Sequence, residues 1–154
     1  MRQSILRYFI SLLLVSLCIC SATSIFIISG SMKEDSEREM MYSVKLIEYN
    51  LDYSGDLNKQ IETLNPLAFS DDTRISVIDE KGKVLADTYK DDISSNHIKR
   101  EEVQEALHSS NHEGYAMRRS ETTNQPLLYA AYYKDNHIIR LSIPYSGVWG
   151  YFPE

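Results

Sequence analysis

Side chains that could hold an anion occur in three separate segments of this sequence. One segment contains Asn96, His97 and Arg100, and the other two contain Arg118 and Arg140. A buried guanidinium group that faces a pocket would attract a carboxylate or a phosphate, because it offers several N–H donors in a planar fork. The chemistry that these residues indicate is therefore the binding of a small anion.

Strand alternation limits how many of the arginines can face such a pocket. The stretch from Glu113 to Ser120 is predicted to be a strand, so Arg118 and Ser120 lie on one face and Arg119 lies on the other. At most one of these two arginines can therefore face inward.

The group of Asn96, His97 and Arg100 has two interpretations. It precedes a predicted helix, and Asn is a common helix N-cap. In the structural interpretation, the three side chains form a hydrogen-bonded cap that fixes a loop onto the helix. In the functional interpretation, the same junction lines the ligand side of the domain.

No set of residues in the sequence supports catalysis. There is no Ser-His-Asp or Cys-His pattern and no Gly-rich phosphate loop. His108 and His112 are four residues apart, a spacing that could hold a metal on a helix, but the residues between them indicate a helix end. We therefore expect no catalytic residue, no metal and no cofactor.

An uncharged run extends from residue 8 to residue 32. At about 1.5 Å per residue, a helix of this length would cover a hydrocarbon core of about 30 Å. A signal peptide would have a shorter apolar stretch followed by a cleavage site with small residues, whereas apolar residues return here at 25–28. The run is interpreted as an uncleaved transmembrane helix.

Charges on the two sides of this run predict its orientation in the cell membrane. Arg2 and Arg7 precede the run, and the segment that follows it is mixed with an acidic bias. The positive-inside rule then makes residues 1–7 a cytoplasmic stub and places residues 33–145 outside, as an extracytoplasmic domain. All acidic residues lie beyond the run, which argues against nucleic acid as a partner.

The helix is predicted to continue beyond the membrane to about residue 52. Met40, Val44, Ile47 and Leu51 recur at helical spacing and form one apolar stripe. Such a stripe could pack on its own domain, on a second copy of the chain, or on both. We predict a homodimer that forms through this stripe.

The remaining elements predict an α+β domain. Period-two patterns that follow a helical region indicate a five-stranded antiparallel sheet with helices packed on one face. The predicted elements are a helix at 57–64 capped by Asp56, strands at 74–79 and 83–87 joined through Gly82 at positive φ, a helix at 100–110, and strands at 113–120, 127–133 and 137–144.

Four stretches carry a resemblance that is more specific than this topology: RISVIDEKGKVLADT, NHIKREEVQEAL, YAMRRSETTNQPLLYAAYY and HIIRLSIPY. They resemble the extracytoplasmic PAS-like (single-Cache) domain of membrane sensor histidine kinases, nearest to the phosphate-regulon sensor type of Gram-positive bacteria. In that family an Ile-Asp strand end precedes a Gly turn, as from Ile78 to Gly82. An Asn-His-x-x-Arg motif then opens a helix, as from Asn96 to Arg100. The resemblance covers residues 5–145.

The resemblance implies a ligand pocket between one sheet face and the loop and helix that cover it. Arg118 or Arg119, Tyr129, Tyr132 and Arg140 would reach into that pocket. The predicted ligand-binding residues are Arg118, Tyr129, Arg140, Asn96, His97 and Arg100.

Sensors of this family continue into a second span, a HAMP linker and a kinase core, whereas residues 146–154 are read as a tail that could derive from truncation. The sequence therefore predicts the signal-sensing input module of a two-component sensor histidine kinase, cut short before the second span and without enzyme activity of its own. The signal would be a small molecule or a protein of unknown identity. The alternatives are a stand-alone membrane-tethered binding module and an input fragment of another receptor class, such as a chemoreceptor or a diguanylate cyclase.

Overall fold

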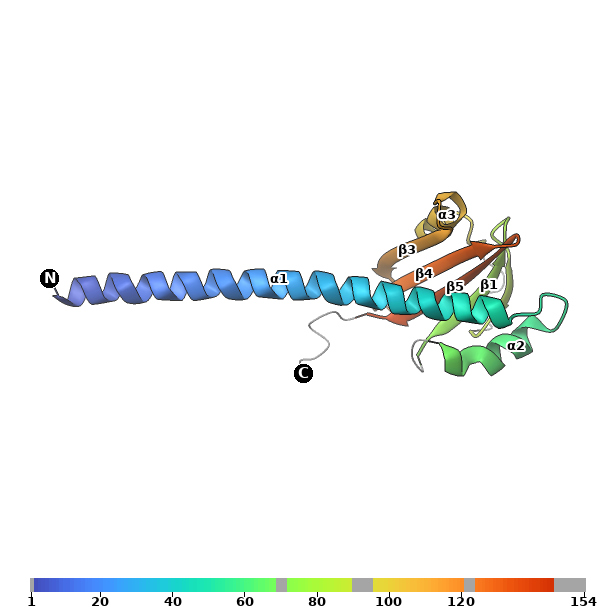
Figure 1. The fold of residues 1–154 in the computed structure, drawn as a ribbon, viewed down its shortest axis with the longest axis horizontal. Coiled ribbons are helices and arrows are strands. Elements are labelled where there is room, and N and C mark those ends of the chain that lie inside the picture. The colour runs from blue at the N-terminus through green and yellow to red at the C-terminus, as the bar shows by residue number, and fades with distance from the viewer. Residues whose placement is uncertain (1, 69–71, 90–95, 121–123, 146–154) are drawn as a thin grey trace. The chain divides into compact units, whose positions relative to one another are not determined.

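The computed structural model describes residues 2–68, 72–89, 96–120 and 124–145, and the predicted tail at 146–154 lies outside these ranges. The described residues form helices and one antiparallel sheet (Figure 1). The helices are α1 (Arg2–Asn50), α2 (Leu57–Leu64), the 3-10 turn η1 (Asn65–Leu67) and α3 (Glu101–His108), and the strands are β1 (Arg74–Asp79), β2 (Val84–Asp87), β3 (Glu113–Arg119), β4 (Pro126–Lys134) and β5 (His137–Pro144).

The chain divides into two units, and the boundary falls within α1. The first unit contains α1 up to Glu34. The second begins at Asp35 and contains every other described element; it is called the sheet domain below.

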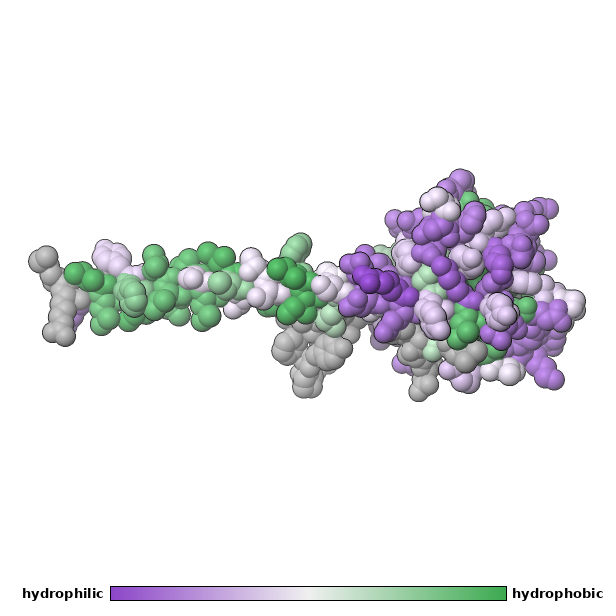
Figure 2. All heavy atoms as spheres, in the orientation of Figure 1, coloured by the Kyte–Doolittle hydropathy of each residue, from purple (hydrophilic) through white to green (hydrophobic). Residues whose placement is uncertain are grey.

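The first unit carries hydrophobic side chains that face outward along α1 (Figure 2). Leu12 is 68% exposed, Leu17 64% and Phe26 81%, so no side of this segment is packed away from solvent. Within the described part of the chain, α1 is the one helix long and apolar enough to cross a membrane. A helix that is apolar on all sides is favoured in lipid, which agrees with the predicted span.

The sheet has the strand order β2-β1-β5-β4-β3, and every neighbouring pair is antiparallel. The first and last strands of the chain, β1 and β5, therefore lie side by side in the middle. Their register pairs Ser76 with Arg140 and Val77 with Ile139. This pairing brings together residues that are far apart in the sequence.

One face of the sheet packs against α1 and α2. Alternate residues of the central strands, such as Ile75 and Leu141, join Ile61 of α2 and Ile47 of α1 in a buried core. This core contains most of the buried apolar side chains of the sheet domain, so α1 is part of its folded structure.

The other face packs against α3, where Val103 and Ala106 contact Ala131 and Ile138. The prediction of helices on one face only is therefore wrong. The central strands are buried along most of their length, because side chains on both faces are covered. Gly114 lies beneath α3 and leaves no space for a Cβ atom against the backbone of Glu102, so the helix lies directly on β3.

The apolar stripe of α1 packs on its own domain. Met40, Val44 and Ile47 are fully buried, and Leu51 is partly buried against the same core. A homodimer stays a prediction, but these side chains cannot supply its contact surface, because the sheet of their own domain already covers them. A dimer contact through α1 would have to use its outer face, where Tyr42 is exposed.

Local signals in the sequence predicted two element boundaries correctly and one wrongly. Asp56 caps α2 by accepting a hydrogen bond from the Lys59 amide at 3.3 Å, and Gly82 has a φ of 83°. Asn96, however, does not cap α3. The N-cap residue is Arg100, which makes no side-chain capping bond. The side chain of Asn96 instead donates to the Lys81 carbonyl and accepts a hydrogen bond from the Ile98 amide.

Candidate functional site

Polar and charged side chains gather on the sheet face that carries α3. They form what is called the polar cluster below, and most of them are buried. The strand register builds the cluster, since Ser76 stands beside both Asp87 and Arg140 on neighbouring strands. Its members are Arg74, Ser76, Asp87, His97, Glu102, Arg118, Tyr129 and Arg140.

Arg140 lies at the centre of the polar cluster and is only 2% exposed. Its Nη1 donates to Nδ1 of His97 at 2.6 Å, and its Nη2 donates to Oγ of Ser76 at 3.0 Å. Burial lowers the pKa of Arg140 from its ordinary value, although a guanidinium group stays protonated in proteins. Its Nε is buried and has no hydrogen-bond partner among the described residues. A buried donor of this kind is costly unless something binds it.

Glu102 ties α3 to the sheet through Arg118. The two guanidinium nitrogens of Arg118 donate to the two carboxylate oxygens of Glu102 at 2.6 and 2.9 Å. Burial alone would raise the pKa of Glu102, but the hydrogen bonds and charge of Arg118 outweigh it and hold that pKa below its usual value. Glu102 is therefore ionised at neutral pH, and its Oε1 also lies 3.6 Å from Arg140.

The aromatic ring of Tyr129 lies close to both Arg118 and Arg140. The guanidinium carbon of Arg118 lies 3.6 Å from the centre of the Tyr129 ring, and that of Arg140 lies 5.7 Å from it. Both distances allow a cation–π interaction. Both arginines therefore lie within cation–π distance of one ring.

Asp87 holds the third arginine of the polar cluster. Arg74 donates to both carboxylate oxygens of Asp87 at 2.8 and 2.9 Å, and Ser76 donates to one of them at 2.7 Å. Because the same hydroxyl of Ser76 accepts a hydrogen bond from Arg140, the bonds run continuously from β2 to β5.

The three arginines of the polar cluster are paired unequally. Arg74 forms a two-point ion pair with Asp87, and Arg118 forms one with Glu102. Arg140, in contrast, lies 3.6 Å from Glu102 and makes no two-point ion pair with a described residue. An anion would complete the pairing of Arg140.

The segment that carries His97 is fastened to the turn between β1 and β2. The His97 amide donates to the carbonyl of Gly82 at 2.7 Å, and Asn96 donates to the carbonyl of Lys81 at 2.9 Å. A Cβ atom on Gly82 would collide with the backbone of Ile98. The close approach of two backbones at this glycine therefore fixes the position of the imidazole.

The structure brings four of the six predicted site residues together. Arg118, Tyr129, Arg140 and His97 are in the polar cluster. Asn96 is exposed and positions the His97 segment from outside.

The other predicted residue, Arg100, lies at the N-cap of α3, where its amide donates to the His97 carbonyl at 3.0 Å. Arg119 is exposed and donates to the Asn124 carbonyl, while Arg118 pairs with Glu102 on the α3 face. The two arginines thus lie on opposite faces, as alternation predicts.

The sequence reasoning missed Arg74, Ser76, Asp87 and Glu102. The sequence did contain a signal for Ser76: it is a polar residue that shares one face of a strand with the apolar Ile78, which indicates a polar group in a buried position. Glu102 gave no such signal, because an acidic residue in the first turn of a helix is commonly explained by the helix dipole.

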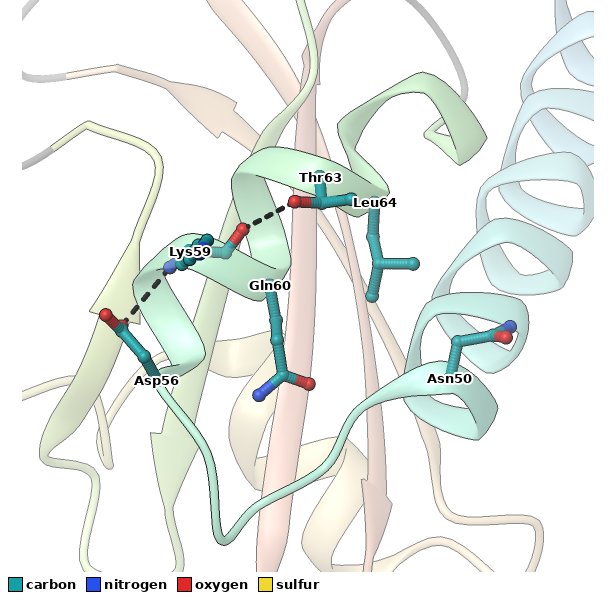
Figure 3. A pocket seen from close by; sticks show the side chains of 6 residues that line it. All are labelled: Asn50, Asp56, Lys59, Gln60, Thr63 and Leu64. Atoms are coloured by element: carbon teal, nitrogen blue, oxygen red, sulfur yellow. Dashed lines mark hydrogen bonds between the residues drawn. The ribbon is translucent and has the colours of Figure 1, made fainter.

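A separate hollow of about 330 Å³ lies between the end of α1 and α2 (Figure 3). Its polar groups serve local structure, since Asp56 caps α2 and Thr63 donates to the Lys59 carbonyl at 2.9 Å. Gln60 is bonded to the backbone of Asp52 through both ends of its amide. The side chains of Asp56, Gln60 and Thr63 are therefore already engaged in local hydrogen bonds.

No cluster of three or more His, Cys, Asp or Glu side chains that could hold a metal occurs in the ranges that the structure describes. His108 is exposed at the end of α3, where its Nδ1 lies 2.8 Å from the Gln104 carbonyl. His112 is exposed beyond the helix, with a φ of 59°. The two histidines thus lie in different backbone environments.

No family model and no curated protein matches the chain. Among solved structures, the Bacillus subtilis YkuI protein, which has an EAL domain and was solved with its substrate c-di-GMP and calcium, is 16% identical with a TM-score of 0.54. That match covers 83% of this chain and 36% of YkuI. The ligand-binding domain of the Campylobacter jejuni chemoreceptor Tlp3, in complex with 4-methylisoleucine, is 17% identical with a TM-score of 0.53 and covers 78% of this chain and 55% of that one.

A third match is the extracellular domain of a candidate histidine kinase, rpHK1S-Z16, at 14% identity. It covers 59% of this chain and 38% of that one, and its TM-score of 0.45 is too low to support an argument. The chain thus spans about a third of YkuI and about half of the Tlp3 domain. At these identities the likeness shows a common fold and does not single out the phosphate-regulon sensor type. The α+β fold predicted from the sequence is confirmed, and it is shared with a chemoreceptor ligand-binding domain.

Proposed function

We propose that this chain is a membrane-tethered sensing module whose sheet domain binds a small anion at the polar cluster. The observation that carries the proposal is Arg140, which is buried, makes no two-point ion pair with a described residue and has an Nε without a partner among the described residues. Burying an incompletely paired charge is unfavourable in a domain selected only for stability. Such a charge is understandable at a site where an anion completes the pairing.

The shared fold supports the sensing role. The Tlp3 domain was solved with 4-methylisoleucine, an amino acid and therefore a carrier of a carboxylate. A guanidinium group recognises a carboxylate or a phosphate by two parallel hydrogen bonds. In this chain the Nε of Arg140 and Nη2, the terminal nitrogen on the same edge of the guanidinium, would present such a pair once the hydrogen bond from Nη2 to Ser76 opens.

The proposed location is the cell membrane, with the N-terminus cytoplasmic and the sheet domain outside. α1 would then connect the domain to the membrane, and a change in how it packs on the sheet would be the signal. The chain would act without enzyme activity of its own and as a homodimer through the outer face of α1. No nucleic acid would be involved.

For the output, we propose a sensor histidine kinase, as the resemblance of residues 5–145 implies. A chemoreceptor or diguanylate cyclase input fragment and a stand-alone binding module are the alternatives. The coding DNA downstream of codon 154 distinguishes them. A second span, a HAMP linker and a kinase core would support the kinase, and an unrelated gene would overturn that assignment.

Thermal unfolding of the full chain in detergent micelles tests the binding site. Acetate and sulfate serve as carboxylate and tetrahedral probes, with chloride at matched ionic strength as the baseline. Either probe should raise the melting temperature of the unmodified chain. Arg140→Gln should abolish the shift, whereas the control Arg119→Gln, on the exposed side of β3, should keep it. Circular dichroism at 25 °C would show that each variant is folded, and the absence of any shift in the unmodified chain would overturn the proposal.

A further inference from the structure

Strand β3, at the edge of the described sheet, is held by α3 along its backbone. The hydroxyl of Ser109, the C-cap residue of α3, donates to the carbonyl of Glu113 at 2.7 Å. Two residues further along the strand, the amide of Tyr115 donates to the carboxylate of Glu105 at 2.7 Å. Between these two bonds, α3 lies directly on Gly114. A displacement of α3 would therefore carry the first half of β3 with it.

The side chain of Glu113 joins the same part of β3 to α1. Its carboxylate accepts hydrogen bonds from Nζ of Lys45 at 2.5 Å and from the side-chain amide of Asn111 at 2.9 Å. The hydroxyl of Tyr115 is a third donor at 3.1 Å, and its ring packs against the core that contains α1. Because three donors fix the carboxylate, its position follows the backbone of β3. Glu113 is thus held by α3 through its carbonyl and by α1 through its side chain.

A second ion pair holds α1 on the neighbouring strand. Glu48, one turn beyond Lys45 on α1, accepts a hydrogen bond from Lys134 of β4 at 2.8 Å. β4 lies between β3 and β5, so it is paired on both sides, whereas β3 is paired with β4 alone among the described strands. α1 therefore has one contact with a strand inside the sheet and one with the strand that α3 holds. A shift of β3 relative to β4 would turn α1 about the contact at Glu48.

Glu102 connects the anion site to α3. Its Oε1 lies 3.6 Å from Arg140, while both of its carboxylate oxygens are paired with Arg118 of β3. An anion paired with Arg140 would compensate the charge of that guanidinium and weaken its attraction to Glu102. Glu102 would then be held by Arg118 alone. The first turn of α3 would move away from β5, together with β3.

We propose that occupancy of the anion site is transmitted to α1 through strand β3, and that the pair of Glu113 and Lys45 makes α1 follow the strand. This inference rests on the proposed function and adds how the same site is coupled to the membrane helix. α3 and the first half of β3 would move together, and the pair of Glu48 and Lys134 would be the pivot. Helices that switch at an interface shift by about 1–2 Å.

Distances between two nitroxide labels, measured by electron paramagnetic resonance, test this movement in the full chain in detergent micelles. One label is attached to α1 at Glu39→Cys and the other to the β1–β2 turn at Glu80→Cys, two exposed positions of the sheet domain. The turn belongs to the side of the sheet away from β3. The native Cys18 and Cys20 are replaced by alanine, and an excess of unlabelled chain isolates the distance within one chain. Acetate and sulfate are the probes, with chloride at matched ionic strength as the baseline.

In the labelled parent chain, at least one probe should change the mean distance by about 1–2 Å, and Arg140→Gln should abolish the change. Lys45→Gln and Glu113→Gln should lose most of it and keep the anion-induced thermal shift, because neither residue belongs to the polar cluster. The conservative Lys45→Arg keeps the ion pair and should keep the distance change. The matched control Lys134→Gln removes the other ion pair of α1 and should show a change at least as large as that of the parent.

The outcomes separate the transmission from the binding site. A thermal shift without a distance change in the parent chain would overturn the transmission and leave the anion site standing. A distance change that persists in full in Lys45→Gln would do the same. The absence of any thermal shift would overturn the binding site itself and the transmission with it. The side chain of Lys45 is 45% exposed, so Lys45→Gln keeps the test available if the hydrogen bonds of Glu113 prove necessary for folding.

Discussion

The pairing of Glu102 with Arg118 leads to the most direct prediction for the polar cluster. Glu102→Gln keeps the shape of the side chain and removes its charge, so Arg118 and Arg140 lose a fully buried counter-charge. Breaking a buried ion pair by removing one partner costs about 3–5 kcal/mol. The side chain of Arg118 is 27% exposed and can recover some hydration, which places the expected loss at about 3 kcal/mol, the lower end of that range.

Urea-induced unfolding of the full chain in detergent micelles, followed by circular dichroism at pH 7.5, measures this loss. The matched control is Glu101→Gln, the preceding residue of α3, whose side chain is exposed. It loses a favourable interaction with the helix dipole and a weaker charge interaction with Arg118, both at an exposed side chain, and should cost less than about 1 kcal/mol. The two variants therefore separate the ion pair from a general effect of charge on α3.

The same measurement at lower pH checks the sign of the electrostatic contribution. The pKa of Glu102 is below its usual value, because the hydrogen bonds and charge of Arg118 outweigh burial, which alone would raise it. The stabilisation is thus fully present above the ordinary carboxyl value of about 4.3 and is lost as the pH falls through the lower folded value. The difference between the unmodified chain and Glu102→Gln should stay constant from pH 7.5 to about 5 and shrink below about 4. A loss no larger than that of Glu101→Gln at pH 7.5 would refute the reasoning.

Three further predictions concern the framework of the site. Gly82→Ala should lower the free energy of unfolding by about 1–3 kcal/mol, because the residue has a φ of 83° and a Cβ atom there would collide with the backbone of Ile98. Urea unfolding measures this loss, and an unchanged midpoint would contradict the close approach of the two backbones. Ile47→Ala should cost about 2–5 kcal/mol in the same assay, while Tyr49→Ala on the exposed side of α1 should cost about 0.5 kcal/mol or less; equal losses would mean that α1 does not complete the core. In intact cells a membrane-impermeant maleimide should label Ser110→Cys but should label Gln3→Cys only after permeabilisation, and the reverse pattern would invert the proposed orientation.

Much of the fold could be predicted because its signals are local. The uncharged run marks the apolar part of α1, period-two alternation marks the strands, and Asp56 and Gly82 mark a helix start and a turn. Each of these signals depends on residues within a few positions of one another, where the geometry of helix and strand dictates which side chains are neighbours. The face of the sheet that α3 would cover was not predictable in this way, since the apolar face of a helix does not say which sheet face it meets.

The candidate site could be predicted only in part for the same reason. Alternation limited the inward arginines of β3 to one of Arg118 and Arg119, and the resemblance identified Arg140 and His97. The carboxylates that pair with the arginines were missed, because the buried position of Glu102 follows from the docking of α3 at Gly114. The ion pairs of the site depend on these carboxylates, which the sequence did not predict.

The sequence by itself determined that the chain has one long apolar helix, an α+β domain with five strands, and arginines able to bind an anion. Only the tertiary structure decided that the α1 stripe packs on its own sheet and that Arg140 meets His97 and Ser76, which are 43 and 64 residues away in the sequence. The physical reason is that hydrogen bonds and ion pairs require atoms to lie within about 3 Å, and the register of β1 with β5 and the docking of α3 set those positions.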